Sequence, residues 1–179
     1  MASDLPTPTL ETERFILRPL VRADAEALYP TLSDPEQCLY MLRAAFSSLD
    51  ELNDWLFDRD WDGRSWGAVD RETRELVARI VAVPAGEVQS EIGYTTMSHR
   101  RGEGIAVECS RRLIDYLFAE ESHHRVTAGT DPRNAASNRV LEKLGFRREA
   151  HHIQSIKTHL GWCDEYCWAQ LRSEWQVTR

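Results

Sequence analysis

The order of strand-like and helix-like segments predicts an α/β or α+β fold, with one sheet and helices packed on it. Two observations support this class. Short, alternating apolar runs recur along the chain, and amphipathic segments with helical spacing lie between them. The length of 179 residues favours a single domain spanning 1–179, with residues 1–8 as a loosely held lead-in.

The first half of the chain is predicted to supply four strands and two helices. Residues 14–20 (RFILRPL) alternate and are rich in large apolar side chains, which is typical of a strand. A helical segment over 22–32 follows, and Pro30 is expected to break or kink it. Ser48 and Glu51 form a capping-box pattern at the start of the second helix. The remaining strands are expected over 65–70, 75–83 and 90–97.

The second half begins with the best-defined helix, from about 103 to 119. Cys109, Leu113 and Leu117 lie on one face of it, and charged residues occupy the other. A strand, a DPRN turn, a second helix and two strand-like runs around a loop follow. The strand covers 124–130 and the turn 131–134. The helix covers 135–144 and is closed by Gly145, and the two strand-like runs lie on either side of Gly161.

Composition excludes several functional classes. The net charge of −7 argues against a general affinity for nucleic acid. No apolar run approaches the ~18 residues that a membrane span needs, and the N-terminus lacks the features of a secretory signal. We therefore expect a cytoplasmic protein that binds no membrane. The four cysteines form no CxxC pair, and the spacing of His159, Cys163 and Cys167 is a poor match to a zinc site, so no metal is expected.

The stretch SHRRGEGIA, residues 98–106, has the features of an anion-binding turn. It joins a predicted strand to a predicted helix, where backbone N–H groups converge and the helix dipole adds positive charge. A Walker loop is excluded because no Gly-Lys-Ser/Thr triplet is present. A dinucleotide fingerprint is excluded because Val107 stands where the third glycine belongs. Taken alone, the two glycines are equally consistent with an ordinary tight turn.

Arg101-Gly-Glu-Gly104-Ile-Ala106 resembles the R/Q-x-x-G-x-G/A signature of the GNAT superfamily of N-acetyltransferases. The segment DPRNAASNRVLEKLGF, residues 131–146, is similar to the corresponding segment of the RimJ/RimL subgroup. LETERFILRPL near the N-terminus and WCDEYCWAQLRSEW near the C-terminus are similar to the ends of the same subgroup, so the resemblance runs from about residue 9 to about residue 175.

This resemblance implies a mixed, mostly antiparallel sheet of about seven strands, with splayed central strands and flanking helices. It also implies acetyl-CoA as co-substrate, with its pyrophosphate on the glycine turn and a backbone N–H near Met97 polarising the thioester carbonyl. The expected coenzyme-binding residues are Met97, Arg101, Gly102, Glu103, Gly104, Ile105, Ala106, Asn134 and Ser137.

Glu91 is the candidate general base, because it shares one face of its strand with Gly93 and Thr95, where the resemblance implies an acid or a bound water. Many family members carry a tyrosine in the second helix that protonates the leaving thiolate, but the matching position here is Leu141. Ser137, one turn earlier on the same face, is the second catalytic candidate and would hydrogen-bond the coenzyme sulfur. Asn134 is expected to cap this helix as well as to touch the coenzyme.

The predicted activity is acetyl transfer to a primary amine, either a small molecule or a peptide N-terminus. Tyr40, Trp55 and Trp66 lie in the region that roofs the acceptor site in this family, and one of them is expected to line it. A homodimer is compatible with the resemblance. The missing tyrosine at Leu141 leaves one alternative open, a non-catalytic acyl-CoA-binding regulatory module.

Overall fold

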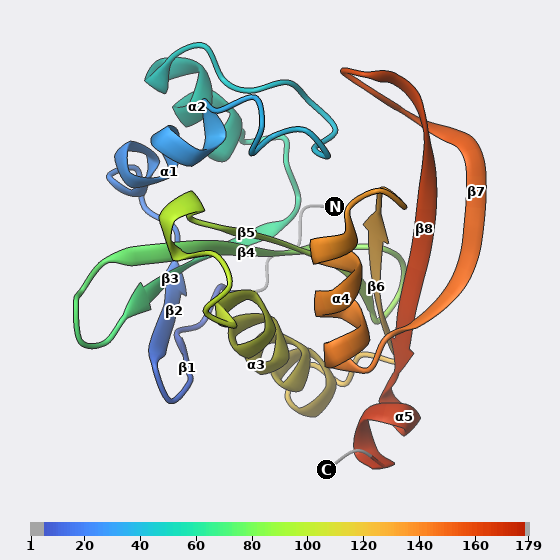
Figure 1. The fold of residues 1–179 in the computed structure, drawn as a ribbon. Coiled ribbons are helices and arrows are strands. Elements are labelled where there is room, and N and C mark those ends of the chain that lie inside the picture. Colours follow the sequence, from blue (N-terminus) through green and yellow to red (C-terminus); the bar gives the residue numbers. More distant parts are fainter. Residues whose placement is uncertain (1–5, 178–179) are drawn as a thin grey trace.

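The computed structural model describes residues 6–177, which form one mixed sheet with helices on both faces (Figure 1). Among these residues the sheet has eight strands in the order β1-β2-β3-β4-β5-β6-β8-β7. The strands are β1 (Leu10–Glu11), β2 (Phe15–Pro19), β3 (Arg64–Asp70), β4 (Leu76–Pro84), β5 (Gln89–Thr96), β6 (Arg125–Thr130), β7 (Arg147–Thr158) and β8 (Gly161–Leu171). The helices are α1 (Asp24–Leu32), α2 (Leu49–Leu56), α3 (Ile105–Ala119), α4 (Ala135–Leu144) and α5 (Arg172–Val177), with a short 3-10 turn at Ser98–Arg100.

The predicted fold class is confirmed, since every neighbouring pair of described strands is antiparallel except β5 and β6. The sheet gains one strand over the expected seven because the two-residue β1 pairs with β2. Such a short segment carries too few residues to show a period-2 pattern in the sequence. None of the helices in the described residues is long and apolar enough to cross a membrane.

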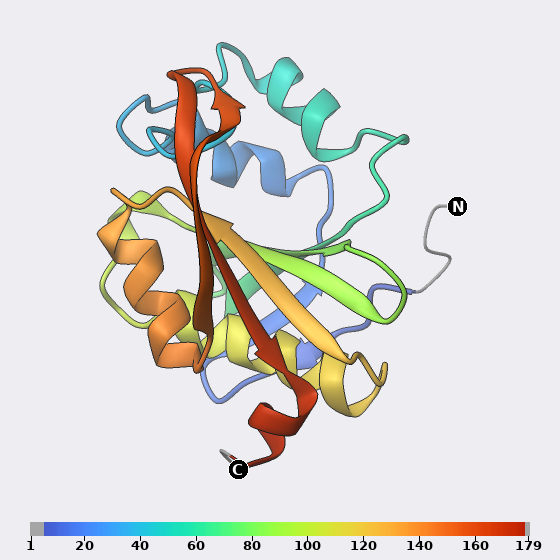
Figure 2. The same ribbon diagram turned by 90° about the vertical axis from the view of Figure 1, so that its right-hand side faces the viewer.

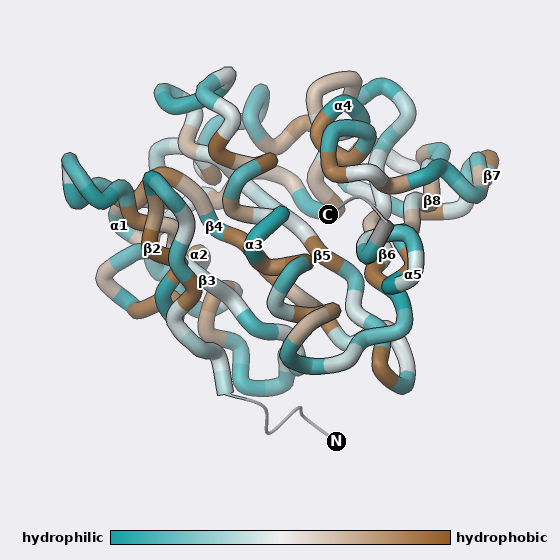
Figure 3. Tube along the Cα trace, turned by 90° about the horizontal axis from the view of Figure 1, so that it is seen from below, coloured by the Kyte–Doolittle hydropathy of each residue, from teal (hydrophilic) through white to brown (hydrophobic). Residues whose placement is uncertain are grey.

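The two faces of the sheet hold separate apolar cores. Helix α3 packs on one face with α4 beside it, and α1 and α2 cover the other (Figure 1). Figure 3 looks onto the α3 side, where hydrophobic and hydrophilic residues alternate along that helix as its amphipathic pattern predicts. Leu113 and Leu117 of α3 are fully buried in the larger core, whereas Leu28 and Leu52 belong to the smaller core under α1 and α2.

Helix α1 contains Pro30 without ending at it. The proline lies in the last turn, and the helix closes two residues later, where the N–H of Ser33 donates to the carbonyl of Tyr29. A proline removes one N–H from the helix ladder, so its effect is smallest close to the end of the helix. The expected break is therefore displaced to Leu32.

The lead-in is held more firmly than expected over its described part. The carbonyl of Pro8 accepts a hydrogen bond from the indole Nε1 of Trp66 at 2.8 Å, and Pro6 accepts one from Arg64 at 3.4 Å. Residues 1–5 lie outside the described residues. The segment from Pro6 to Pro8 is thus anchored against β3.

A buried ion pair joins β3 to the end of α3. The Arg64 guanidinium binds the Glu121 carboxylate through two hydrogen bonds of 2.6 and 2.8 Å, and both side chains are less than 10% exposed. Burial by itself would raise the pKa of Glu121, but the hydrogen bonds from Arg64 and Tyr116 outweigh it and hold that pKa below its usual value.

Replacing Arg64 with alanine is expected to lower the free energy of unfolding by about 3–5 kcal/mol, because it leaves a carboxylate buried without its cation. Urea denaturation at neutral pH measures this loss. The matched control is Arg71→Ala, which breaks an exposed pair with Glu11 and is expected to cost less than about 1 kcal/mol. Equal losses in the two variants would contradict the prediction.

Candidate functional site

Strands β5 and β6 separate in the middle of the sheet. Their parallel pairing runs from Gln89 opposite Arg125 to Glu91 opposite Thr127, and then stops. Beyond this point both strands continue, to Thr96 and Thr130, without pairing to each other. A cavity of about 800 Å³, hereafter the larger cavity, lies between them and is also lined by the first turns of α3 and α4.

The register of β5 against β4 decides which backbone groups face this opening. The N–H of Met97 donates to the carbonyl of Val77 on the β4 side at 2.9 Å. Because successive residues of a strand direct their N–H and C=O groups to opposite edges, those of Ile92, Tyr94 and Thr96 point toward the separated β6. The middle of the sheet therefore presents unpaired backbone donors and acceptors to the larger cavity.

The same hydrogen bond corrects one expectation. The N–H of Met97 is already used by the ladder with β4, and its side chain is 1% exposed within the smaller core. Met97 therefore has no donor left for a ligand in the cavity. The donor nearest to the expected position that faces the opening belongs to Thr96.

The glycine turn leads directly into α3 and leaves the first turn of that helix open. Gly102 and Gly104 both have positive φ, of 84° and 78°, which favours glycine strongly. Gly104 is the N-cap, so no side chain caps the first N–H groups of α3, and the first helical bond runs from Glu108 to the Gly104 carbonyl. The N–H groups of residues 105–107 remain for an anion.

Most of the expected turn residues line the larger cavity, namely Arg101, Gly102, Gly104, Ile105 and Ala106. The exception is Glu103, whose carboxylate turns away and binds the Arg100 guanidinium at 3.0 Å. The side chain of Ile105 is buried in the core, so only its backbone faces the turn. Arg101 forms no ion pair with any described residue.

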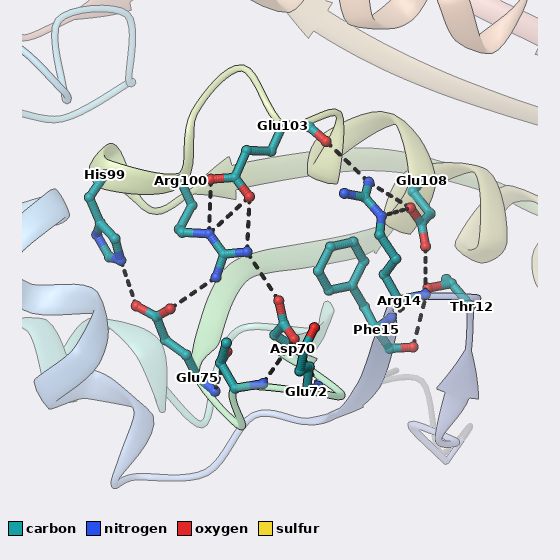
Figure 4. Close-up of polar contacts among 11 residues, drawn as sticks. Thr12, Arg14, Phe15, Asp70, Glu72, Glu75, His99, Arg100, Glu103 and Glu108 are labelled. Atoms are coloured by element: carbon teal, nitrogen blue, oxygen red, sulfur yellow. Dashed lines mark hydrogen bonds and ion pairs between the residues drawn. The ribbon is translucent and has the colours of Figure 1, made fainter.

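Two arginines brace the turn from outside (Figure 4). Arg100 bridges Glu103 to Asp70, the last residue of β3, and to Glu75 in the β3–β4 connection. Arg14 donates to the Glu108 carboxylate and to the carbonyl of Glu103. Both guanidinium groups are thus neutralised by carboxylates and act on the shape of the turn.

His99 joins the same network, since its Nε2 contacts the Glu75 carboxylate (Figure 4). The sequence placed this histidine in the turn, but the contact directs it away from the larger cavity, and it is not among the residues that line that cavity.

The first turn of α4 faces the turn across the larger cavity. The expected cap is confirmed, because the Asn134 side chain accepts a hydrogen bond from the N–H of Ser137 at 3.1 Å. Both residues line the larger cavity. Arg139 and Lys143, one turn apart on the same helix, line it as well and add positive charge that sequence reasoning missed.

Tyr94 is a further site residue that the sequence did not reveal. Its hydroxyl lies 2.9 Å from the Ser137 hydroxyl and 3.1 Å from the Ser137 carbonyl oxygen, across the gap between β5 and α4. Burial raises the pKa of Tyr94 to about 12, although the hydrogen bond with Ser137 opposes this shift. The phenol therefore keeps its proton at neutral pH. Leu141, in contrast, is fully buried in the core and does not line the cavity.

A second cavity, of about 460 Å³ and hereafter the smaller cavity, adjoins the larger one. The two share residues 93–95 and 129–131, together with Tyr40 and Met41, as lining. Segment 39–43, the β7–β8 hairpin, Trp55 of α2 and residues of β4 and β5 supply the other walls. Figure 2 shows this hairpin reaching toward the segment between α1 and α2. Of the three aromatic residues among which one was expected to line the acceptor site, Tyr40 and Trp55 line the smaller cavity, whereas Trp66 is completely buried in the larger core.

Glu91 and Glu165 place two carboxylates at one end of the smaller cavity. They approach β6 at Gly129, where a Cβ atom would lie 2.6 Å from Glu165 Oε1 and 3.8 Å from Glu91 Oε1. Desolvation by the cavity walls, and then the negative charge of Glu165, raise the pKa of Glu91 above its usual value. Neither carboxylate forms an ion pair with a described residue.

The only grouping of potential metal ligands in residues 6–177 is His152, Glu165 and Cys167, whose donor atoms lie within 4.8 Å of one another. It differs from the set of His159, Cys163 and Cys167 considered from the sequence. Three donors leave a tetrahedral site one ligand short, and His152 is exposed.

Comparisons with known proteins agree with this geometry. A family profile described as an acetyltransferase (GNAT) domain matches residues 14–147. The chain is 29% identical over 167 residues to the uncharacterized N-acetyltransferase YnaD of Bacillus subtilis, covering 93% of this chain and 98% of that protein. It is 26% identical over 117 residues to the ribosomal protein uS5-alanine N-acetyltransferase of Escherichia coli, covering 64% and 60%. Among solved structures, a GNAT-family acetyltransferase from Bacillus anthracis superposes with a TM-score of 0.86 at 26% identity, covering 93% and 99%.

Proposed function

Because the chain belongs to the GNAT family of acetyltransferases and is an acyltransferase enzyme, we propose that it moves an acetyl group from acetyl-CoA to a primary amine. The observation that carries this proposal is the opening between β5 and β6, which lies directly beside the uncapped first turn of α3. Unpaired strand edges suit the amide groups of a pantetheine arm, and the helix terminus suits its pyrophosphate.

In this proposal the larger cavity holds the coenzyme. The carbonyl of Ile92 and the backbone groups of Tyr94 and Thr96 bind the pantetheine arm in the manner of an added strand. The N–H groups of residues 105–107, with Arg101, bind the pyrophosphate. The thioester then lies near the segments that both cavities share.

The acceptor amine enters from the smaller cavity and attacks the thioester carbonyl directly. Glu91 takes a proton from the amine as its nitrogen–carbon bond forms and the carbon–sulfur bond breaks. Tyr94, rather than Ser137 alone, returns a proton to the leaving thiolate, because a phenol is a stronger acid than a serine hydroxyl. Ser137 holds the phenol in place. The products are an N-acetylated amine and free coenzyme A.

We also place the chain in the RimJ/RimL-like subgroup, supported by the motif over 131–146 and by the similarity to the uS5-alanine N-acetyltransferase. Membership of an enzyme family favours catalysis over a non-catalytic acyl-CoA-binding module. Calorimetric titration with acetyl-CoA, followed by a thiol-release assay against a panel of amines and short peptides, tests the whole proposal. Binding without release across the panel would favour the module instead.

Gly104→Asp is expected to weaken acetyl-CoA binding by about 100-fold or more, since it places a negative side chain at the N-terminus of α3 and forces a positive φ on a non-glycine residue. Calorimetry measures the affinity. Gly161→Asp is the matched control, because Gly161 also has positive φ but lies in the β7–β8 turn, away from the larger cavity. Similar affinities for coenzyme in the two variants would refute the pyrophosphate assignment.

Glu91→Gln is expected to slow turnover by about 10²- to 10⁴-fold by removing the general base. In the unaltered enzyme kcat/KM should fall as the pH drops through the raised pKa of Glu91, because only the carboxylate accepts a proton. Glu165→Gln removes the neighbouring negative charge and should shift this acidic limb to lower pH. If Glu165→Gln does not shift the acidic limb of the pH–rate profile, the assignment of Glu91 as the base is contradicted.

Tyr94→Phe is expected to reduce kcat by about 10²-fold or more while changing the KM for acetyl-CoA little, because the phenol acts on the leaving thiolate. Ser137→Ala should reduce kcat less, since the backbone carbonyl of residue 137 still holds the phenol. Steady-state kinetics with saturating amine separates the two parameters. If Ser137→Ala proves the more damaging of the two, the serine hydroxyl is the proton donor.

A further inference from the structure

The smaller cavity carries opposite charges at two places, and neither charge is neutralised by described residues. Six arginine, aspartate and glutamate side chains line it. Three of them have partners, namely Arg43 with Glu51, Asp131 with Arg133, and Asp164 with His151. The other three, Arg79, Glu91 and Glu165, form no ion pair with any residue in 6–177. A charged group held in a cavity without a partner suits a ligand of opposite charge.

Arg79 is the most unusual of these groups. It lies on β4 and is only 9% exposed. Its Nε and Nη2 atoms donate to the Ser65 hydroxyl at 3.2 and 2.8 Å, and no described residue accepts from Nη1. A guanidinium has five N–H groups, so three of them have no acceptor within the described residues.

The aromatic surroundings of Arg79 fix its position without neutralising its charge. The centroids of the Trp55 and Trp61 rings lie 4.8 and 5.5 Å from its central carbon. Burial lowers the pKa of Arg79 to about 10, because no carboxylate offsets the loss of water. The group is still a cation at neutral pH. It is therefore a rigid, partly desolvated donor at the wall of the cavity, of the kind that binds a carboxylate through paired hydrogen bonds.

Strand register places Arg79 and the carboxylates on the same face of the sheet. Arg79 is opposite Thr95, and Glu91 is opposite Val83, so four residues of β4 separate them. The Arg79 side chain leans toward Ser65, which is opposite Val81, and this halves the separation along the strands to roughly 7 Å. Ser65 belongs to β3, so the guanidinium also lies on the side of β4 away from Glu91, and the ligand must span this sideways distance as well. The two charges thus flank the shared segment at Gly93, next to the expected position of the thioester.

We propose that the acceptor is a small free amino acid, with its amino group at Glu91 and Glu165 and its carboxylate bound by Arg79. This inference rests on the proposed acetyl transfer and names its substrate class. The two carboxylates attract the ammonium form, which loses one proton to solvent before it attacks, and Glu91 receives the second proton as the nitrogen–carbon bond forms. A peptide N-terminus is a poorer match, because its first carbonyl is part of an amide and brings no anion to Arg79. A polyamine would bring a second cation toward the guanidinium.

Matched acceptors test this inference through the rate of thiol release from acetyl-CoA. Each set contains a free amino acid, its carboxamide, its decarboxylated amine and the corresponding aminophosphonate, and the sets vary the amine-to-carboxylate spacing from α to δ. For at least one spacing, the free acid is expected to exceed its carboxamide and its amine by about 30-fold or more in kcat/KM. Equal rates for acid and carboxamide, or a preference for short peptides, would overturn the inference, and so would a preference for the aminophosphonate.

The variant Arg79→Met supplies a second readout. It should abolish the preference for the acid over its carboxamide by raising the KM of the acid, with acetyl-CoA affinity as the check on folding. Arg43→Met is the matched control, since Arg43 lines the same cavity but is paired with Glu51, and it should keep the preference. A preference that survives Arg79→Met would assign the carboxylate to another group.

The outcomes also separate this inference from the function on which it rests. Release that occurs with amines but ignores the carboxylate overturns the inference alone. A protein that binds no acetyl-CoA, or releases no thiol with any acceptor, contradicts the proposed function and the inference together.

Discussion

The structure depends on an interrupted hydrogen-bond ladder in the middle of its sheet. Beyond Glu91 and Thr127, β5 and β6 no longer pair, which leaves backbone groups without partners at the one place where a sheet normally satisfies them. Each strand nevertheless stays in place because its other edge is paired, β5 with β4 and β6 with β8. The antiparallel pairs on both sides thus hold open a gap that a smaller sheet would close.

The charge around this gap is positive, although the chain as a whole is acidic. The net charge is −7, yet cations outnumber carboxylates in the lining of the larger cavity, which contains Arg100, Arg101, Arg139 and Lys143 against Glu36 and Asp131. Arg14 and Arg100 form ion pairs with carboxylates, and these pairs hold the turn in its shape. Different arginines therefore determine the shape of the turn and the charge beside it. The net charge of the whole chain says little about either property.

Local patterns were sufficient to predict most of the fold. The helices over 105–119 and 135–144 follow from their apolar spacing and terminal signals, and the capping role of Asn134 follows from its position alone. The succession of strands along the chain was predicted for the same reason, but their order in the sheet was not. The shape of the glycine turn could also be predicted, because the positive φ angles of its two glycines depend on residues close in the sequence.

Features that depend on distant contacts or on strand register could not be predicted from the sequence. Tyr94 looks like an ordinary strand aromatic until α4 brings Ser137 within 2.9 Å of it. Whether the N–H of Met97 faces the gap depends on which edge of β5 pairs with β4, and no residue type encodes that choice. Trp66 could not be told from Trp55 by type, and only packing shows that one is core and the other is cavity wall. Arg79 did leave a signal, since an arginine interrupts the apolar run LVARIVAV.

The two cavities meet along residues 93–95 and 129–131 and at Tyr40 and Met41, and their other walls come from different parts of the chain. Two ligands can therefore be present together, each against its own walls, with their reactive ends in contact at the junction. The shared segments, Gly-Tyr-Thr and Gly-Thr-Asp, contain no cysteine or lysine to carry an acyl group from one side to the other. In the proposed acetyl transfer, such an arrangement favours a ternary complex, in which the group passes directly between the two ligands.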